Sequence, residues 1–111
     1  MKLTYEYREK DMYGSIFHMK TKAGQEQKVA EQFDAWEKNR RPNIDGAMGG
    51  LVMMPDGAPG TVIAVAIFQD EASYRANSDD PAQGEWYQKL RALLEEDPTW
   101  EDGEFVSQTL G

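Results

Sequence analysis

The stretch Gly60-Thr-Val-Ile-Ala-Val-Ala-Ile-Phe-Gln-Asp-Glu-Ala-Ser-Tyr-Arg-Ala-Asn77 decides the fold. Residues 61–68 carry no charge and are rich in β-branched side chains, which predicts a strand covered on both faces. Asp70 follows as the expected N-cap of a short helix that runs through Asn77. The rest of the chain is therefore expected to pack around residues 61–68.

A first strand is predicted at residues 13–21. Because successive side chains of a strand point to opposite faces, Phe17 and Met19 share one face, and Ile16 and His18 share the other. Both faces carry bulky side chains. Neither face is therefore expected to be fully solvated.

A helix is predicted at residues 25–39. Val29, Phe33 and Trp36 recur at i, i+4 and i+7, and polar residues occupy the opposite side, as in an amphipathic helix. The sequence Arg40-Arg-Pro42 is expected to end it, since basic residues suit a helix C-terminus and proline opposes continuation.

The next strand is predicted at residues 47–54. Its internal Gly49-Gly50 pair indicates a β-bulge or a close approach of another backbone. Residues 55–60 contain two prolines and two glycines, which is typical of a hairpin loop. Strands 47–54 and 61–68 are therefore expected to pair in antiparallel fashion.

Past Asn77 the chain is expected to start a new helix, with Asp80 as N-cap and Pro81 as first helical residue. The apolar residues of this segment form a stripe, namely Trp86, Leu90, Leu93 and Leu94. A final strand is predicted at residues 104–110, and its short length and polar residues suit a sheet edge.

The element order predicts a ferredoxin-like α+β fold, βαββαβ, with an antiparallel four-stranded sheet. One layer of two helices can cover only one side of such a sheet. The chain is therefore expected to be a homodimer through its sheet, forming a dimeric α+β barrel. At 111 residues a single domain is expected at residues 12–111, preceded by an N-terminal arm at residues 1–11.

Charge and composition exclude several classes of function. The net charge of −8 arises from residues 70–111, and no basic stripe offsets it, so nucleic acids and anionic membrane surfaces are not expected as partners. The chain has no cysteine and one histidine, which argues against a metal site and fits a cytoplasmic protein. The start of the chain lacks the apolar core of a signal peptide.

Two segments resemble the antibiotic biosynthesis monooxygenase (ABM) domains, including the quinol monooxygenase-like members. They are Lys20-Thr-Lys-Ala-Gly-Gln-Glu26 and Phe68-Gln-Asp-Glu-Ala-Ser-Tyr-Arg-Ala-Asn-Ser-Asp-Asp-Pro81. The resemblance covers roughly residues 13–110. It implies a dimeric α+β barrel that holds a small hydrophobic or aromatic ligand between the sheet and the helices of one subunit.

The resemblance also implies the oxygenation of quinols or phenols without a metal or flavin cofactor. An electron-rich phenolate can itself reduce O₂, so the protein need only orient the ring, promote its deprotonation and exclude water. Many members carry histidine at the positions of Asn77 and Ala82, where this chain has none. The helix histidine that haem-degrading members use as an axial ligand is also missing.

Three residues are candidate catalytic groups. His18 could act as a base on a phenol, because imidazole titrates near neutral pH. Its alternative role is that of a core or interface histidine with one hydrogen bond. Tyr74 and Asn77 could bind a ligand oxygen from neighbouring faces of the helix that begins near Asp70. Asn77 could instead only cap or interrupt that helix.

The candidate substrate-binding residues are mostly aromatic: Phe68, Trp86, Trp36 and Phe33, with Arg75 added as a partner for an anionic ligand. Aromatic residues at helical spacing more often belong to the core. A solvated surface pair with Asp79 is the commoner role for a residue such as Arg75.

Two functions follow as hypotheses. The first is a cofactor-independent monooxygenase of small aromatic or quinol substrates. The alternative is a non-catalytic dimeric barrel that binds a small molecule or acts in a stress response. A dimer without a cavity, serving only as an interaction scaffold, is a third possibility.

Overall fold

The computed structural model describes residues 12–107 and 109, so the predicted N-terminal arm at residues 1–11 lies outside the described residues. The elements follow the expected order of strand, helix, two strands, helical segments and strand. They are β1 (Met12–Lys20), α1 (Glu26–Ala35), the π-helical turn η2 (Trp36–Arg40), the 3₁₀ turn η3 (Arg41–Asn43), β2 (Ala47–Met53), β3 (Thr61–Phe68), α2 (Glu71–Ser78), α3 (Pro81–Arg91) and β4 (Thr99–Phe105).

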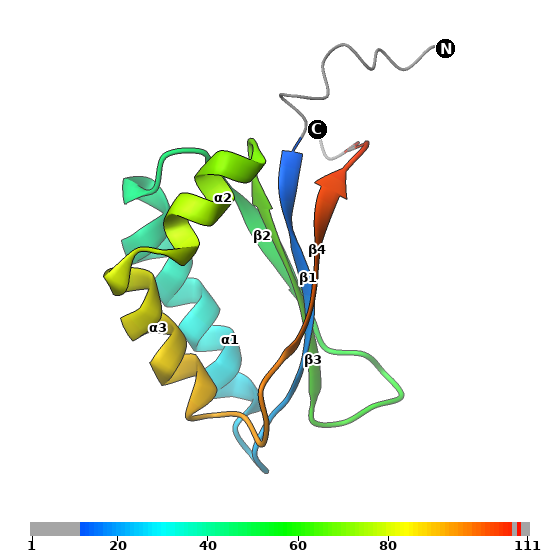
Figure 1. Ribbon diagram of the computed structural model, residues 1–111. Coiled ribbons are helices and arrows are strands. Elements are labelled where there is room, and N and C mark those ends of the chain that lie inside the picture. The colour runs from blue at the N-terminus through cyan, green and yellow to red at the C-terminus, as the bar shows by residue number, and fades with distance from the viewer. Residues whose placement is uncertain (1–11, 108, 110–111) are drawn as a thin grey trace.

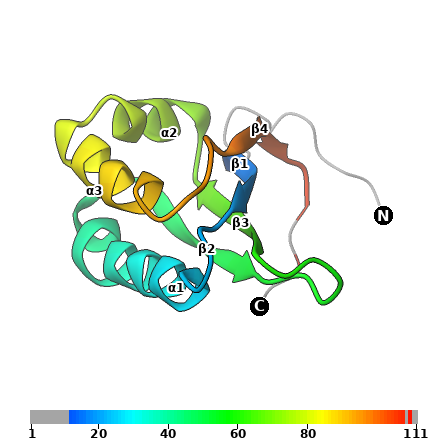
Figure 2. The same cartoon turned by 90° about the horizontal axis from the view of Figure 1, so that it is seen from below.

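The four strands form one sheet in the order β2-β3-β1-β4, and every neighbouring pair is antiparallel. All three α-helices lie on one side of the sheet, and no described segment covers the other side (Figures 1 and 2). This topology confirms the predicted ferredoxin-like α+β fold. It also places α2 and α3 over the central strands, where they can enclose a site.

Local signals predicted the middle of the chain well. Strand β3 has the predicted bounds, and the shift in β2–β3 pairing between Ala47 and Gly49 is the predicted irregularity next to the glycine pair. Asp70 caps α2 by accepting a hydrogen bond from the Ser73 backbone N–H at 2.8 Å. Asp80 caps α3 in the same way, with Pro81 as first helical residue.

The predicted helix at residues 25–39 is wrong in its last turn. The α-helix ends at Ala35, and a π-helical turn, η2, carries the chain on to Arg40. π-Helical turns are rare in proteins and are often found at functional sites. Here η2 places Trp36 and Arg40 where both reach Gln83 of α3.

The predicted last strand at residues 104–110 is also wrong in its position. Strand β4 begins at Thr99, because its register against β1 places Trp100 opposite Phe17. The two rings stack with their centroids 4.5 Å apart, a contact that offsets the poor strand propensity of the acidic residues around it. Phe17 is far from Trp100 in the sequence, so local composition gives no sign of this stabilising contact.

The core lies between the sheet and the helices. Phe17 and Met19 point toward the helices and meet Val29 of α1 and Leu90 of α3, which are fully buried. Trp86 donates from Nε1 to the Gln32 carbonyl oxygen, and the Gln32 side chain returns a hydrogen bond to the Trp86 carbonyl. These contacts fix α1 against α3.

The opposite face of the sheet, here called the outer face, is apolar and open. Pairing aligns Leu51 of β2, Val65 of β3 and Ile16 of β1 in one row across it. Leu51 is 57% exposed and Ile16 is 37% exposed. Within one chain, β3 is therefore covered on one face and not on both as predicted, because every helix packs on the same side.

Candidate functional site

A pocket of about 800 Å³ lies between the helix-facing side of the sheet and the helices. This volume falls within the usual range of small-molecule sites, about 300–1,000 Å³. Eight aromatic side chains line it, and they include all three tryptophans of the chain: Phe17, Phe33, Trp36, Phe68, Tyr74, Trp86, Tyr87 and Trp100. Such walls suit a flat apolar ligand.

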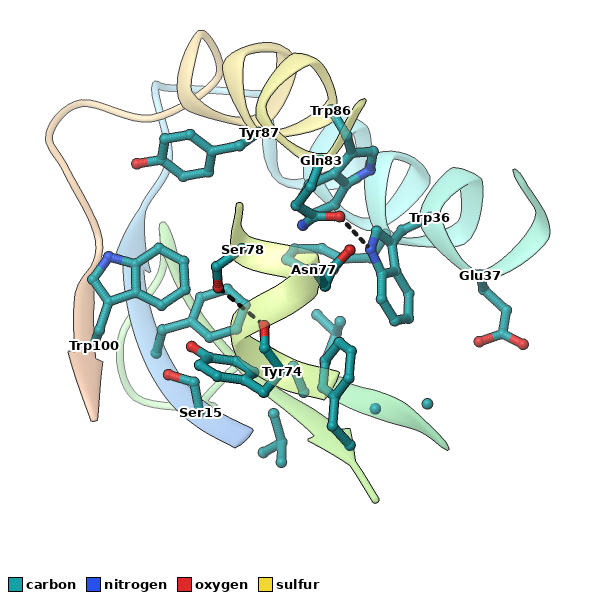
Figure 3. A pocket seen from close by; sticks show the side chains of 18 of the residues that line it. Ser15, Trp36, Glu37, Tyr74, Asn77, Ser78, Gln83, Trp86, Tyr87 and Trp100 are labelled. Carbon is teal, nitrogen blue, oxygen red and sulfur yellow. Dashed lines mark hydrogen bonds between the residues drawn. The ribbon is translucent and has the colours of Figure 1, made fainter. Parts of the chain in front are cut away.

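Six of the eight predicted site residues line this pocket: Phe33, Trp36, Phe68, Tyr74, Asn77 and Trp86. The aromatic rings among them pack edge to face in two groups, Phe33 with Trp86 and Phe68 with Trp36 and Tyr74. The centroid of Phe33 lies 5.3 Å from that of Trp86, and the centroid of Phe68 lies 5.4 Å from that of Tyr74. The structure thus brings these residues together from α1, η2, β3, α2 and α3. Figure 3 labels Trp36, Tyr74, Asn77 and Trp86 among them.

Asn77 is the buried amide of the pocket. It lies in the last turn of α2 and is 8% exposed. Its Oδ1 accepts a hydrogen bond from Arg40 Nη2 at 2.8 Å. A guanidinium only donates hydrogen bonds, so this contact determines which way the amide is turned. The Asn77 NH₂ group makes no hydrogen bond to another described residue and is free to donate to a ligand.

Arg40 is held behind Asn77 by a second set of contacts. Its Nε donates to Gln83 Oε1 at 3.3 Å, and the same oxygen accepts a hydrogen bond from Trp36 Nε1 at 3.1 Å (Figure 3). Asp80 Oδ2 lies 3.7 Å from Arg40 Nη2. The Arg40 side chain is only 15% exposed, so this guanidinium is part of the structure and not a mobile surface group.

Tyr74 lies one turn before Asn77, and its hydroxyl donates to Asp102 Oδ1 at 3.0 Å. Burial raises the pKa of Tyr74 to about 12, and the hydrogen bond and negative charge of Asp102 act in the same direction. The neighbouring Ser15 hydroxyl and the Arg75 charge act in the opposite direction. Tyr74 is therefore a neutral hydrogen-bond donor near pH 7 and not a base.

This raised pKa predicts a loss of stability at high pH. Above about pH 10 the unfolded chain releases the Tyr74 proton while the folded chain keeps it, so the free energy of unfolding should fall up to about pH 12. Urea unfolding at about pH 9 and about pH 11 measures the fall, which should be smaller in Tyr74→Phe. Equal falls in both proteins would contradict the assigned pKa. The difference between wild type and variant also removes the contribution of Tyr87, whose pKa burial raises as well.

Arg75 does not line the pocket, and its predicted pairing with Asp79 is wrong. Its Nη1 lies 3.5 Å from Asp102 Oδ2, and its Nη2 donates to the Tyr13 hydroxyl at 2.8 Å. The side chain is half exposed and also pairs with Glu71 one turn earlier. Arg75 therefore holds the Asp102 carboxylate in place from the solvent side. Asp102 is far away in sequence, so this partner had no local signal.

His18 lies on the outer face of the sheet and does not line the pocket. The predicted alternation is observed, since Phe17 and Met19 are buried toward the helices and His18 points the other way. Its Nε2 lies 3.5 Å from Glu101 Oε2 on β4. Within one chain the structure thus separates His18 from Tyr74 and Asn77, because all the helices pack on the opposite face of the sheet.

Sequence reasoning missed several residues of the site. Arg40 and Gln83 were not candidates, although both contact Asn77 or its partner. Ser15 is buried in the pocket wall beside Tyr74, and no well-formed hydrogen bond satisfies its Oγ (Figure 3). The alternation that places Phe17 on the inner face also places Ser15 there, so that signal was available. Asp102 lies in β4, whose position was predicted wrongly, so its contacts with Tyr74 and Arg75 were not predicted.

Among the described residues there is no group of three or more His, Cys, Asp or Glu side chains placed to hold a metal ion. No helix in residues 12–107 is long and apolar enough to cross a membrane. Three carboxylates line the pocket, namely Asp34, Glu37 and Asp102. Arg41 pairs with Glu37 and lowers the pKa of that carboxyl through a hydrogen bond.

No family model and no curated protein matches the sequence. Solved structures match the fold. A candidate antibiotic biosynthesis monooxygenase of Nitrosomonas europaea superposes with a TM-score of 0.75 at 12% identity, over 89% of this chain and 94% of that one. One of Caulobacter crescentus gives 0.76 at 9% identity, over 94% and 100%. SnoaB of Streptomyces nogalater, described as a cofactor-independent oxygenase, gives 0.65 at 21% identity, over 90% and 97%. The resemblance to ABM proteins is thus confirmed for the fold.

Proposed function

We propose that this protein, which shares the fold of the antibiotic biosynthesis monooxygenases, is a cofactor-independent monooxygenase of small aromatic or quinol substrates. The observation that carries the proposal is an aromatic-lined pocket with one buried amide whose NH₂ group is free to donate, that of Asn77. The walls select a flat ring, and the amide selects an oxygen substituent on it. Neighbours that share this fold are named as monooxygenases, which supports the same class of reaction.

The reaction needs no electron source other than the substrate. A ring hydroxyl loses its proton, and the electron-rich phenolate transfers electrons to O₂. One oxygen atom enters the ring as a carbonyl, and the other leaves as water together with the two hydrogens that the substrate loses. The protein contributes orientation of the ring by the aromatic walls and stabilisation of the phenolate oxygen by Asn77.

Deprotonation in this pocket requires help from the protein. The burial that raises the pKa of Tyr74 would also raise the pKa of a bound phenol, because both lose water. Asn77 opposes this effect by donating to the phenolate oxygen, and Tyr74 stays neutral beside it. The proton can pass to Asp102, whose carboxylate lines the pocket, or leave to solvent. His18 has no part in this scheme, since it lies on the outer face.

The proposed working unit is a homodimer through the outer face. The row Leu51, Val65 and Ile16 continues into a second row, in which Met53, Ile63 and His18 are paired across the same three strands. A continuous apolar surface on three adjacent strands is a common mark of a protein–protein interface. A second copy offers the same apolar surface in return, as a two-fold symmetric contact requires.

Oxygen uptake tests the function. The wild type is expected to consume O₂ with at least one member of a panel of hydroquinones and naphthols, without added metal or flavin. Ala66→Leu should lower this uptake, because Ala66 lies on the pocket floor in β3 and a larger side chain there occupies the space of the ring. Ala76→Leu makes the same change on the exposed side of α2 and should keep the activity.

Equal activity in the two leucine variants would place the reaction outside this pocket. Saturable binding of the panel without any O₂ uptake would favour the alternative function, a small-molecule-binding protein without chemistry. One observation favours that alternative: the only histidine of the chain lies away from the pocket, so no imidazole of the same chain is available as a base.

A further inference from the structure

We infer that Arg40 turns the Asn77 amide into an oxyanion subsite, so that the pocket selects aromatic hydroxyls in their deprotonated, anionic form. Arg40 acts as a positioning residue and does not itself line the pocket. The inference deepens the proposed function and rests on it for the class of ligand. It concerns binding and ionisation, which can be measured without turnover.

The first step concerns the direction of the amide. The 2.8 Å hydrogen bond from Arg40 Nη2 occupies Asn77 Oδ1, and a guanidinium cannot accept a hydrogen bond. The NH₂ group of Asn77 must therefore be the end that is left for a ligand. A donor of this kind binds a carbonyl or phenolate oxygen and makes a charge-assisted hydrogen bond only with the phenolate.

The second step concerns the rigidity of Arg40. It is held on two further sides, by Gln83 Oε1 at 3.3 Å and Asp80 Oδ2 at 3.7 Å, and Gln83 is in turn held by Trp36. Trp36 and Arg40 are the two ends of the π-helical turn η2. The π-helical turn therefore brings the Trp36 and Arg40 side chains to the same oxygen, Oε1 of Gln83 in α3. Preorganised donors of this kind stabilise charge without a cost of reorganisation.

The third step concerns the charges around the site. Arg40 is the cation in direct contact with Asn77, and Asp80 beyond it is nearly half exposed, so solvent screens that carboxylate more than the guanidinium. The other charged groups near the pocket are paired or exposed. Glu37 pairs with Arg41 of η3, Asp102 pairs with Arg75 of α2, and Asp34 of α1 is exposed.

A chromophoric phenol tests the inference. 4-Nitro-1-naphthol fills an aromatic pocket, and its anion is measured directly by absorbance. The probe is titrated with pH in the presence of saturating wild-type protein and saturating Arg40→Met. We expect the apparent pKa of the bound probe to be about one unit lower in the wild type, as for other phenols near a fixed positive charge. Arg40→Lys, which keeps the charge, should recover part of this shift.

Lys38→Met is the matched control, because it removes a cation of the same turn η2 whose side chain is exposed and does not line the pocket. Its bound probe should titrate like that of the wild type. An equal apparent pKa in wild type and Arg40→Met overturns the inference, and so does a probe that fails to bind the wild type.

If Arg40→Met does not fold, the same comparison is made between wild type, Arg40→Lys and Asn77→Ala. A pKa shift without O₂ uptake would contradict the proposed reaction and support the oxyanion subsite. O₂ uptake without a pKa shift would support the reaction and contradict the subsite.

Discussion

Asn77→Ala is expected to lower the rate of quinol-dependent O₂ uptake by about 10²–10³-fold, the usual effect of removing one preorganised oxyanion donor. In the wild type Asn77 lines the pocket, its NH₂ group has no hydrogen-bond partner among the described residues, and Arg40 holds its Oδ1. Alanine removes that donor and leaves the aromatic walls in place. The loss should therefore lie in kcat more than in KM, because the neutral ring hydroxyl must first become an anion, and the Asn77 donor binds that anion more strongly than the neutral hydroxyl. An oxygen electrode with the best quinol of the panel measures both.

The same variant should lose some stability, because Arg40 loses its closest partner. It keeps Gln83 and Asp80, so a cost of about 1–3 kcal/mol is expected. Urea unfolding monitored by tryptophan fluorescence measures this cost and shows whether the variant is folded under assay conditions. Asn39→Ala, on an exposed asparagine of η2, is the control for a general effect of the substitution. Full activity in Asn77→Ala would remove the amide from the mechanism.

Leu51→Glu is expected to raise the dimer dissociation constant by about 100-fold or more. Leu51 lies at the β2 end of the outer-face row, next to Val65, which in turn pairs with Ile16. A second copy seated on this row would bury the new carboxylate without a partner, at a cost of several kcal/mol. Each 1.4 kcal/mol changes the constant tenfold. Sedimentation velocity over a range of micromolar concentrations measures the shift from dimer to monomer.

The subunit itself should tolerate this change, since Leu51 is 57% exposed within one chain. Circular dichroism of the monomeric variant should therefore show the secondary structure of the wild type. Gln88→Glu introduces the same charge on the exposed side of α3 and should leave the dimer intact. A wild type that sediments as a monomer at all concentrations would refute the proposed dimer.

Local physics made much of the fold predictable. Residues 61–68 form β3 because β-branched and aromatic side chains pack well on the pleated surface of a sheet. Asp70 and Asp80 begin α2 and α3 because a side-chain carboxylate two or three residues before a free N–H is a short-range contact. Strand alternation likewise separated His18 from Phe17. Each of these signals acts over a few residues.

The candidate site depended on contacts between distant residues. Arg40 reaches Asn77 across 37 positions, and Tyr74 reaches Asp102 across 28. Such pairs leave no mark on composition or periodicity, so the sequence predicts for Arg40 only a role in ending the helix.

By itself, the sequence determined the order of the elements, the helix caps and the aromatic residues available for a pocket. Only the tertiary structure decided which face of the sheet the helices cover, and therefore that His18 lies outside the pocket and the Asn77 amide inside it. The physical reason is that alternation assigns side chains to two faces, while the packing of helices chooses between them.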